Sequence, residues 1–195
     1  GPNTNLSDDD APNWPGDLDL ETVLDENNTY NATILEFNFE TISEQVSFRY
    51  LFASEEYQEN NSNTCNYSDL FGFLIRPEGS STYTNIALVP GTSTPVKVTT
   101  VHPEVPGACD AINEEYFGSY NNSVSPINFN GQTSILTATT SVIPNETYHV
   151  KLVIADEQNY RYDSAVFLEA GSFLPNIYLG NHRLFETFNP LCENE

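Results

Sequence analysis

The stretch Thr33-Ile34-Leu35-Glu36-Phe37-Asn38-Phe39-Glu40 decides the fold class, because apolar and polar side chains alternate along it. Every second residue from Leu35 to Phe39 falls on one face of an extended strand, and the polar residues between them fall on the other. Residues 45–52 repeat the alternation directly afterwards. The pattern predicts two half-buried β-strands.

The rest of the chain continues in the same way, as short apolar or alternating runs separated by turn residues such as Pro90-Gly91. Further strands are predicted over residues 69–75, 84–89, 96–101, 133–140, 147–155 and 164–173. Residues 102–131 are interpreted as a long loop with one short helix near 111–117. The pattern predicts an all-β protein, an antiparallel two-sheet sandwich that is jelly-roll-like and has long loops.

The length of 195 residues fits one sandwich domain with flanking segments. Residues 1–16 are an acidic N-terminal segment that starts with Gly1-Pro2, interpreted as a tag remnant, and the polar character continues to about residue 20. We expect this region to be a tail or an irregular cap outside the core. Residues 17–173 form the predicted sandwich, and 174–195 an exit strand or linker, so the chain is interpreted as a piece of a longer protein. No stretch approaches the roughly 20 apolar residues of a membrane helix.

The charge balance is strongly acidic, with 6 Lys and Arg against 28 Asp and Glu and a net charge of −22. Such a surface repels phosphate backbones, which argues against nucleic-acid partners, and it disfavours anionic membranes. One interpretation is solubility and halotolerance. A second, compatible interpretation is that some carboxylates require a cation.

Three cysteines are present, Cys65, Cys109 and Cys192, with no CxxC pair and only three His. This composition is a poor fit to a zinc site. We predict a Cys65–Cys109 disulfide that pins two loops and leaves Cys192 over; three free thiols are the alternative. A disulfide would indicate an oxidising compartment.

Acidic residues stand at the ends of several predicted strands, and the loops of a sandwich gather at its two ends, so these carboxylates could converge. Calcium binds six to eight oxygen ligands, and clustered carboxylates without a cation resist ionisation. The spacing does not fit an EF-hand. The alternative is solvated loops, with Asp163 also a candidate for stabilising a turn. The predicted calcium ligands are Glu55, Glu56, Asp69, Asp156 and Asp163, with Glu36 and Ser164 as weaker candidates.

Several separated runs carry a resemblance to the choice-of-anchor L domain, found in large secreted proteins of Bacteroidetes and related bacteria. They are Ala53-Ser54-Glu55-Glu56-Tyr57, Asp69-Leu70-Phe71-Gly72-Phe73, Asn85-Ile86-Ala87-Leu88-Val89-Pro90-Gly91-Thr92, Ala155-Asp156, and Tyr162-Asp163-Ser164-Ala165-Val166-Phe167-Leu168-Glu169. The resemblance runs from about Asp17 to Phe173, and departs from the family at Asn38, where Asp is more usual. It implies a module of a larger multidomain protein at the bacterial cell surface, type IX secretion, a role in adhesion or gliding, and no catalytic activity.

An enzyme is the least supported function class. Glu36 and Glu40 lie about 13 Å apart on a regular strand, whereas paired glycosidase carboxylates lie about 5.5 to 9.5 Å apart. No Gly-x-Ser-x-Gly nucleophile motif is present. We therefore predict a protein that is not an enzyme, with a carbohydrate-active hydrolase as the weakest alternative.

Two non-catalytic classes stay open at this point. The first is a calcium-dependent module that binds an extracellular glycan or peptide through aromatic side chains in loops. The second is a structural spacer that calcium makes rigid; in that case the aromatic residues only cover the ends of the core. The candidate ligand contacts are Tyr57, Tyr67, Tyr160 and Tyr162.

Overall fold

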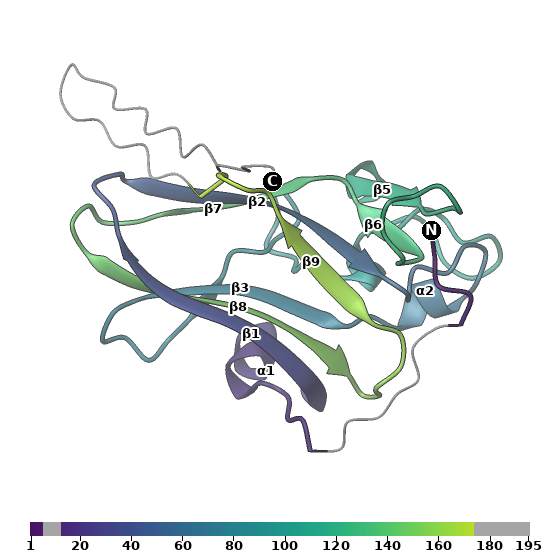
Figure 1. Cartoon of the computed structure of the whole chain (residues 1–195), viewed down its shortest axis with the longest axis horizontal. Coiled ribbons are helices and arrows are strands. Elements are labelled where there is room, and N and C mark those ends of the chain that lie inside the picture. The colour runs from purple at the N-terminus through teal and green to yellow at the C-terminus, as the bar shows by residue number, and fades with distance from the viewer. Residues whose placement is uncertain (6–12, 174–195) are drawn as a thin grey trace, which may run out of the picture.

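A computed structural model describes residues 1–5 and 13–173 of the chain as two antiparallel sheets packed face to face (Figure 1). The first sheet has the order β1-β8-β3-β4, with bounds Thr29–Glu40, Thr147–Glu157, Leu70–Pro77 and Thr84–Asn85. The second has the order β5-β6-β2-β7, with bounds Phe117–Tyr120, Gly131–Thr133, Gln45–Ser54 and Leu136–Ser141, and β9 (Ser164–Leu168) also pairs with β2. The predicted all-β antiparallel sandwich is confirmed, and the jelly-roll path stays a prediction.

The main core lies between the two sheets and is rich in aromatic side chains. Every second residue of β2 from Val46 to Phe52 is buried, and the rings of Phe48 and Tyr50 contact Phe73 and Phe71 of β3. Alternation in the strand sequences therefore selects the face that packs inward, as expected for a sandwich.

Several predicted elements differ from the structure. The predicted strand 133–140 is divided between the end of β6 and β7, the predicted strand 164–173 ends at Leu168, and the predicted loop 102–131 contains β5. Residues 96–101 alternate as a strand does, but Val98–Thr100 form the 3-10 helix η1, with Val96, Val98 and Val101 all buried. Of residues 84–89, only Thr84–Asn85 pair as a strand. The predicted strand backbone is therefore wrong over most of these two segments, because a short apolar run can also be buried as an irregular segment.

The N-terminal region requires a correction, because part of it belongs to the core. Helix α1 (Leu18–Leu24) begins at Asp17, whose side chain accepts a hydrogen bond from the Leu20 backbone N–H (2.8 Å). The Leu20 side chain is fully buried against the outer face of the first sheet. A Cβ at Gly72 would lie 2.7 Å from Leu20 Cδ1, so the glycine on β3 permits the close approach of the helix.

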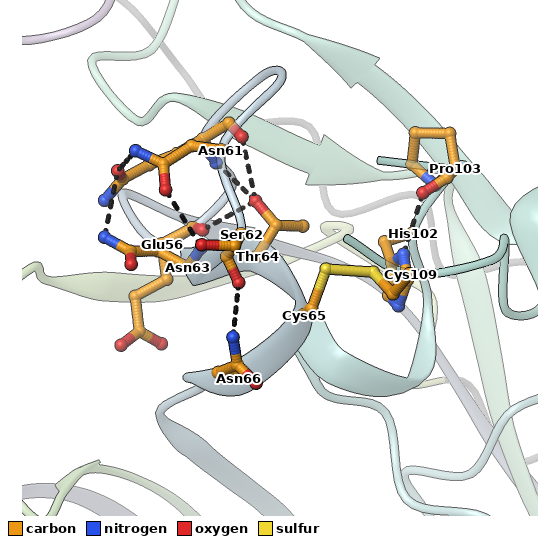
Figure 2. The surroundings of a disulfide bond; sticks show 11 residues. Glu56, Asn61, Ser62, Asn63, Thr64, Cys65, Asn66, His102, Pro103 and Cys109 are labelled. Atoms are coloured by element: carbon orange, nitrogen blue, oxygen red, sulfur yellow. Dashed lines mark hydrogen bonds between the residues drawn. A yellow bond between two sulfur atoms is a disulfide. The ribbon is translucent and has the colours of Figure 1, made fainter. Parts of the chain in front are cut away.

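The predicted disulfide between Cys65 and Cys109 is confirmed, with an S–S distance of 2.05 Å (Figure 2). It joins the short helix α2 (Asn63–Asn66) to the long loop that precedes the 3-10 helix η2 (Glu114–Tyr116). Cys192 and the predicted exit strand or linker lie outside the described residues. No helix within the described residues is long and apolar enough to cross a membrane.

Candidate functional site

The candidate site forms where the inward-facing rows of the core change from apolar to polar at one end of the sandwich. A residue two positions from an inward-facing residue of a strand faces inward too. On β8 this step leads from Ile154 to Asp156, and at the start of β3 it leads from Phe71 back to Asp69. Figure 1 shows the end of β8, the end of β2 and the start of β9 at this end of the molecule. We call the carboxylates gathered here the acidic layer: Glu55, Glu56, Asp69, Asp156 and Asp163.

Three members of the acidic layer are almost completely buried. Glu55, Glu56 and Asp69 are 1%, 3% and 2% exposed, and such complete burial is rare for carboxylates. Glu56 Oε2 accepts a hydrogen bond from the Asp69 backbone N–H (2.7 Å), and Asp69 Oδ2 accepts one from the Ser164 hydroxyl (2.6 Å). These contacts connect the end of β2, the start of β3 and the start of β9.

Burial also shifts the pKa values of Glu56, Asp69 and Asp156. Burial raises the pKa of Glu56 to about 8, with further contributions from Glu157 and Asp156 and an opposing one from the Asp69 N–H. The pKa of Asp69 lies well above its ordinary value, first through burial and then through the neighbouring Glu56 charge. Burial raises the pKa of Asp156 to about 6, and the nearby Asp163 adds to the shift. Simultaneous ionisation of Glu56, Asp69 and Asp156 is therefore unfavourable unless protons or a cation neutralise them.

Glu55 has a different role from Glu56, because it fastens separate segments together. Its carboxylate accepts hydrogen bonds from Asn3 Nδ2 (2.8 Å) and from the Asp163 backbone N–H (3.2 Å). Its backbone N–H donates to the Asp163 carbonyl (3.0 Å), and its carbonyl accepts from Asn130 Nδ2 (3.0 Å). Glu55 thus joins the N-terminal residues, the loop between β8 and β9, and the start of β6.

The disulfide supports the segment that follows Glu56. In Figure 2, Thr64 on α2 lies beside the Glu56 backbone, and its hydroxyl donates to the carbonyls of Glu56 (3.3 Å) and Gln58 (3.0 Å). Cys65, the next residue, carries the bond to Cys109. The loop that leaves the acidic layer is therefore held covalently as well as by hydrogen bonds.

Sequence reasoning missed Asn31, which contacts the acidic layer from β1. The register between β1 and β8 shifts between Tyr30 and Thr33, and Asn31 adopts φ +50° at this irregularity. Its Nδ2 donates to Asp156 Oδ2 (2.8 Å), while its Oδ1 is buried and has no hydrogen-bond partner among the described residues. A buried acceptor without a partner costs about 1–3 kcal/mol. Only the asparagine itself, which tolerates positive φ, is a signal in the sequence.

Glu36 is not brought to the acidic layer. It lies on the outer face of the first sheet, where its carboxylate is 3.5 Å from His149 Nε2, and Asn38 on the same face lies 2.6 Å from His149 Nδ1. The same alternation that turns Phe37 inward turns these residues outward.

The four candidate tyrosines are placed very differently. Tyr57 is fully buried and donates its hydroxyl to the Val101 carbonyl (2.8 Å), so it is a core residue with no surface for a ligand. Tyr67 is 47% exposed. The Tyr160 ring lies 4.7 Å from the ring of Tyr30, and Tyr162 is half-buried with φ +68°. Of the four candidates, Tyr67, Tyr160 and Tyr162 are therefore accessible to a surface ligand and Tyr57 is not.

Within residues 1–5 and 13–173, no group of three or more His, Cys, Asp or Glu side chains is arranged so that it could hold a metal ion. The carboxylates of the acidic layer interact electrostatically, but they do not form a complete set of metal ligands by themselves. Calcium binding would need hydroxyl, amide or backbone oxygens and water in addition, and it stays a prediction.

Comparison with known proteins gives one match. Residues 1–174 match the choice-of-anchor L domain, which covers both sheets and the acidic layer. No curated protein and no solved structure matches the chain. A domain of this type indicates a secreted or cell-surface context and is consistent with a module of a larger protein. The chain belongs to the choice-of-anchor L domain family.

Proposed function

We propose that this chain is a non-catalytic, extracellular module of a surface protein, and that its acidic layer binds a calcium ion. The observation that carries the proposal is the convergence of buried carboxylates at the end of β2 and the start of β3 with the partly buried Asp156 at the end of β8. Their mutual repulsion raises the free energy of the ionised layer, and a divalent cation would offset it. The extracellular setting agrees with the family and with the disulfide.

The proposal draws its charged ligands from Glu56, Asp69, Asp156 and Asp163. Because no three of these described side chains are already arranged to hold an ion, they would have to draw together when calcium binds. Glu55 supports them as a frame, because both of its carboxylate oxygens already accept hydrogen bonds. Calcium tolerates irregular sets of six to eight oxygens and accepts water among them, whereas magnesium demands a near-octahedral set and dehydrates reluctantly. An irregular, partly hydrated site therefore favours calcium over magnesium.

A bound ion would act on the module as a whole. The proposed ligands belong to both sheets, so the ion would fasten β3 and β8 of one sheet to β2 and β9 of the other. This arrangement supports the function of a structural module that calcium makes rigid.

Binding of a glycan or peptide is the second candidate function. The exposed ring of Tyr67 and the Tyr30–Tyr160 pair next to Asp156 favour it. A panel of glycans and peptides would test it. A specific signal that EDTA removes supports this function, and no signal from the folded, calcium-loaded chain contradicts it.

Thermal unfolding in EDTA, in CaCl₂ and in MgCl₂ tests calcium binding. A ligand at a hundredfold excess over Kd stabilises the native state by about 2.7 kcal/mol. For a domain of this size we expect the Tm to rise by roughly 5–10 °C with calcium and much less with magnesium. Asp156→Asn should abolish the rise, whereas the same change at the exposed Asp110 should leave it intact. An unchanged Tm, together with no metal in elemental analysis, would show that protons alone neutralise the layer.

A further inference from the structure

The core between the two sheets is incompletely covered along β1 and β9, and we call this side of the sandwich the open seam. Leu35 of β1 lies in the inward-facing row with Phe37, yet its side chain is 52% exposed. Leu168 of β9 pairs with the inward-facing Tyr50, yet its side chain is 44% exposed. Two apolar side chains that face inward are therefore left about half uncovered by the described residues.

The last described residues of the chain lie in the open seam. The Ser172 hydroxyl accepts a hydrogen bond from the Arg49 N–H of β2 (3.1 Å). The Phe173 ring then contacts both sheets, because its centroid lies 4.2 Å from that of Phe48 on β2 and 5.7 Å from that of Phe37 on β1. The description of the chain thus ends between the two sheets, beside β1.

β1 also has a free backbone edge. The Glu78 N–H donates to the Thr147 carbonyl, and this bond fixes which residues of β8 form hydrogen bonds to β3 and which to β1. With the register between β1 and β8, the odd-numbered residues of 33–39 bond to β8 and the even-numbered residues of 34–40 face away from it. Within residues 1–5 and 13–173, no hydrogen bond reaches the backbone groups of these even-numbered residues.

We propose that residues 176–180, Asn176-Ile177-Tyr178-Leu179-Gly180, pair with the free edge of β1 as an added strand and close the open seam. Only two residues separate this segment from Phe173. The three Cα–Cα steps span up to about 10 Å, which exceeds the spacing of about 4.8 Å between neighbouring strands. The inference does not depend on calcium binding.

The side chains and charge of this segment suit the edge that it would meet. Strand alternation places Ile177 and Leu179 on one face, where they would cover Leu35 in the open seam. β1 presents Glu36 and Glu40 on its outer face, and like charges opposite each other destabilise a strand pair. Residues 174–185 carry no acidic residue, so they avoid this repulsion although the chain as a whole is strongly acidic.

Hydrogen exchange of single amides in the full chain, followed by NMR, tests the proposal. The amides of Leu35 and Phe37 donate to β8 and report on the stability of the sandwich. The amides of Ile34, Glu36 and Asn38 lie on the free edge and report on the added strand. We expect these three edge amides to exchange at least about a hundredfold more slowly than in an unstructured peptide, because a paired amide exchanges only when the structure opens.

The double variant Ile177→Asp/Leu179→Asp tests which segment protects the edge. It places two charges against the open seam, so the edge amides should return to fast exchange while those of Leu35 and Phe37 stay protected. Leu191→Asp is the matched control, because it makes the same type of change outside the proposed strand. This control should leave the exchange of the edge amides unchanged.

Three results would overturn the proposal. The first is fast exchange of the edge amides in the wild-type chain, and the second is protection that persists in the double variant. The third is protection that rises with protein concentration, which would show that a second copy of the chain pairs with β1.

Discussion

At the scale of single residues, Asp69 shows how strand alternation can carry a charge into a core. It lies two positions before Phe71, an inward-facing residue, and the antiparallel pairing of β3 with β8 fixes that orientation. The burial of the carboxylate thus follows from the hydrophobic row that continues after it. Its hydrogen bond from Ser164 compensates only part of the cost of removing the charge from water.

The Asp69→Asn variant should separate two effects of this carboxylate: its repulsion of the neighbouring carboxylates and its proposed contribution to calcium binding. Without calcium, the neutral amide keeps the shape of the side chain and removes a buried charge, so we expect a gain in stability on the order of 1–3 kcal/mol. With calcium, the rise in Tm should be largely lost. Calorimetry in EDTA and in CaCl₂ measures both effects, with the exposed Asp110→Asn as control. Lower stability in EDTA combined with an undiminished calcium response would contradict this account.

The acidic layer also predicts how the metal-free chain responds to pH. Glu56 faces Asp69, Asp156 and Glu157, and its pKa of about 8 in the folded chain compares with about 4.3 for an unfolded chain. The native state therefore binds more protons, and its stability should be greatest near pH 4 and fall as the pH rises to about 8. Urea unfolding in EDTA between pH 5 and 8 should show a loss on the order of a few kcal/mol, which saturating calcium reduces. A rise in stability over this range would be the opposite of the expected result.

Part of the site could be predicted from sequence and part could not. Glu56, Asp69 and Asp156 flank alternating runs, so their place at strand ends was visible. Asn31 depends on a local register shift, which the alternation in β1 does not encode. Tyr57 lies in a polar stretch of sequence, yet its side chain is buried. Gly131 has no side chain to collide with it, and its ring packs against the ring of Phe117.

At the scale of elements, the docking of α1 depends on a buried ion pair on the outer face of β8. Lys151 Nζ lies 2.5 Å from Asp17 Oδ2 and 2.7 Å from Asp19 Oδ2. Asp17 caps the helix with its other oxygen, so one carboxylate both begins α1 and fastens it to the sheet. Sequence reasoning missed this element because seven residues show little helical periodicity, and a lysine within a strand ordinarily faces solvent.

Lys151→Ala should therefore be far more damaging than removal of an exposed cation. It leaves the buried Asp17 carboxylate without its partner, and we expect a loss of about 3–5 kcal/mol in the free energy of unfolding. Arg49→Ala removes the cation of the exposed pair with Glu169 and should cost about 1 kcal/mol or less. Denaturant unfolding of both variants measures the difference. Similar small losses in the two variants would show that the pair does not hold α1.

At the scale of the whole molecule, the chain has a net charge of −22, because its 28 acidic residues far outnumber its 6 Lys and Arg residues. The described cations are largely engaged within the chain: Arg49 with Glu169, Lys97 with Glu26, and Lys151 with Asp17 and Asp19. The remaining carboxylates repel one another across the surface, which destabilises the compact state.

Monovalent salt should therefore stabilise the metal-free chain. Raising NaCl from about 20 to 500 mM shortens the screening length well below 10 Å and weakens this repulsion. We expect the Tm in EDTA to rise by a few degrees, and to rise less at pH 4.5, where part of the carboxylates carry protons. A Tm that falls with salt would indicate that attractive ion pairs dominate the surface.

The pairing of β1 also determines the order in which the chain can fold. Among the described strands of the first sheet it pairs with β8, which lies near the far end of the sandwich sequence, and the next strand, β2, belongs to the other sheet. Apart from the contacts of its first residues with Trp14 and Pro15, β1 therefore has no strand to pair with until almost the whole domain has been synthesised. Such non-local closure is slow, in the range of milliseconds to seconds. Until then, β1 exposes the apolar side chains of its Leu35–Phe39 segment together with its unpaired backbone, and is therefore prone to aggregate.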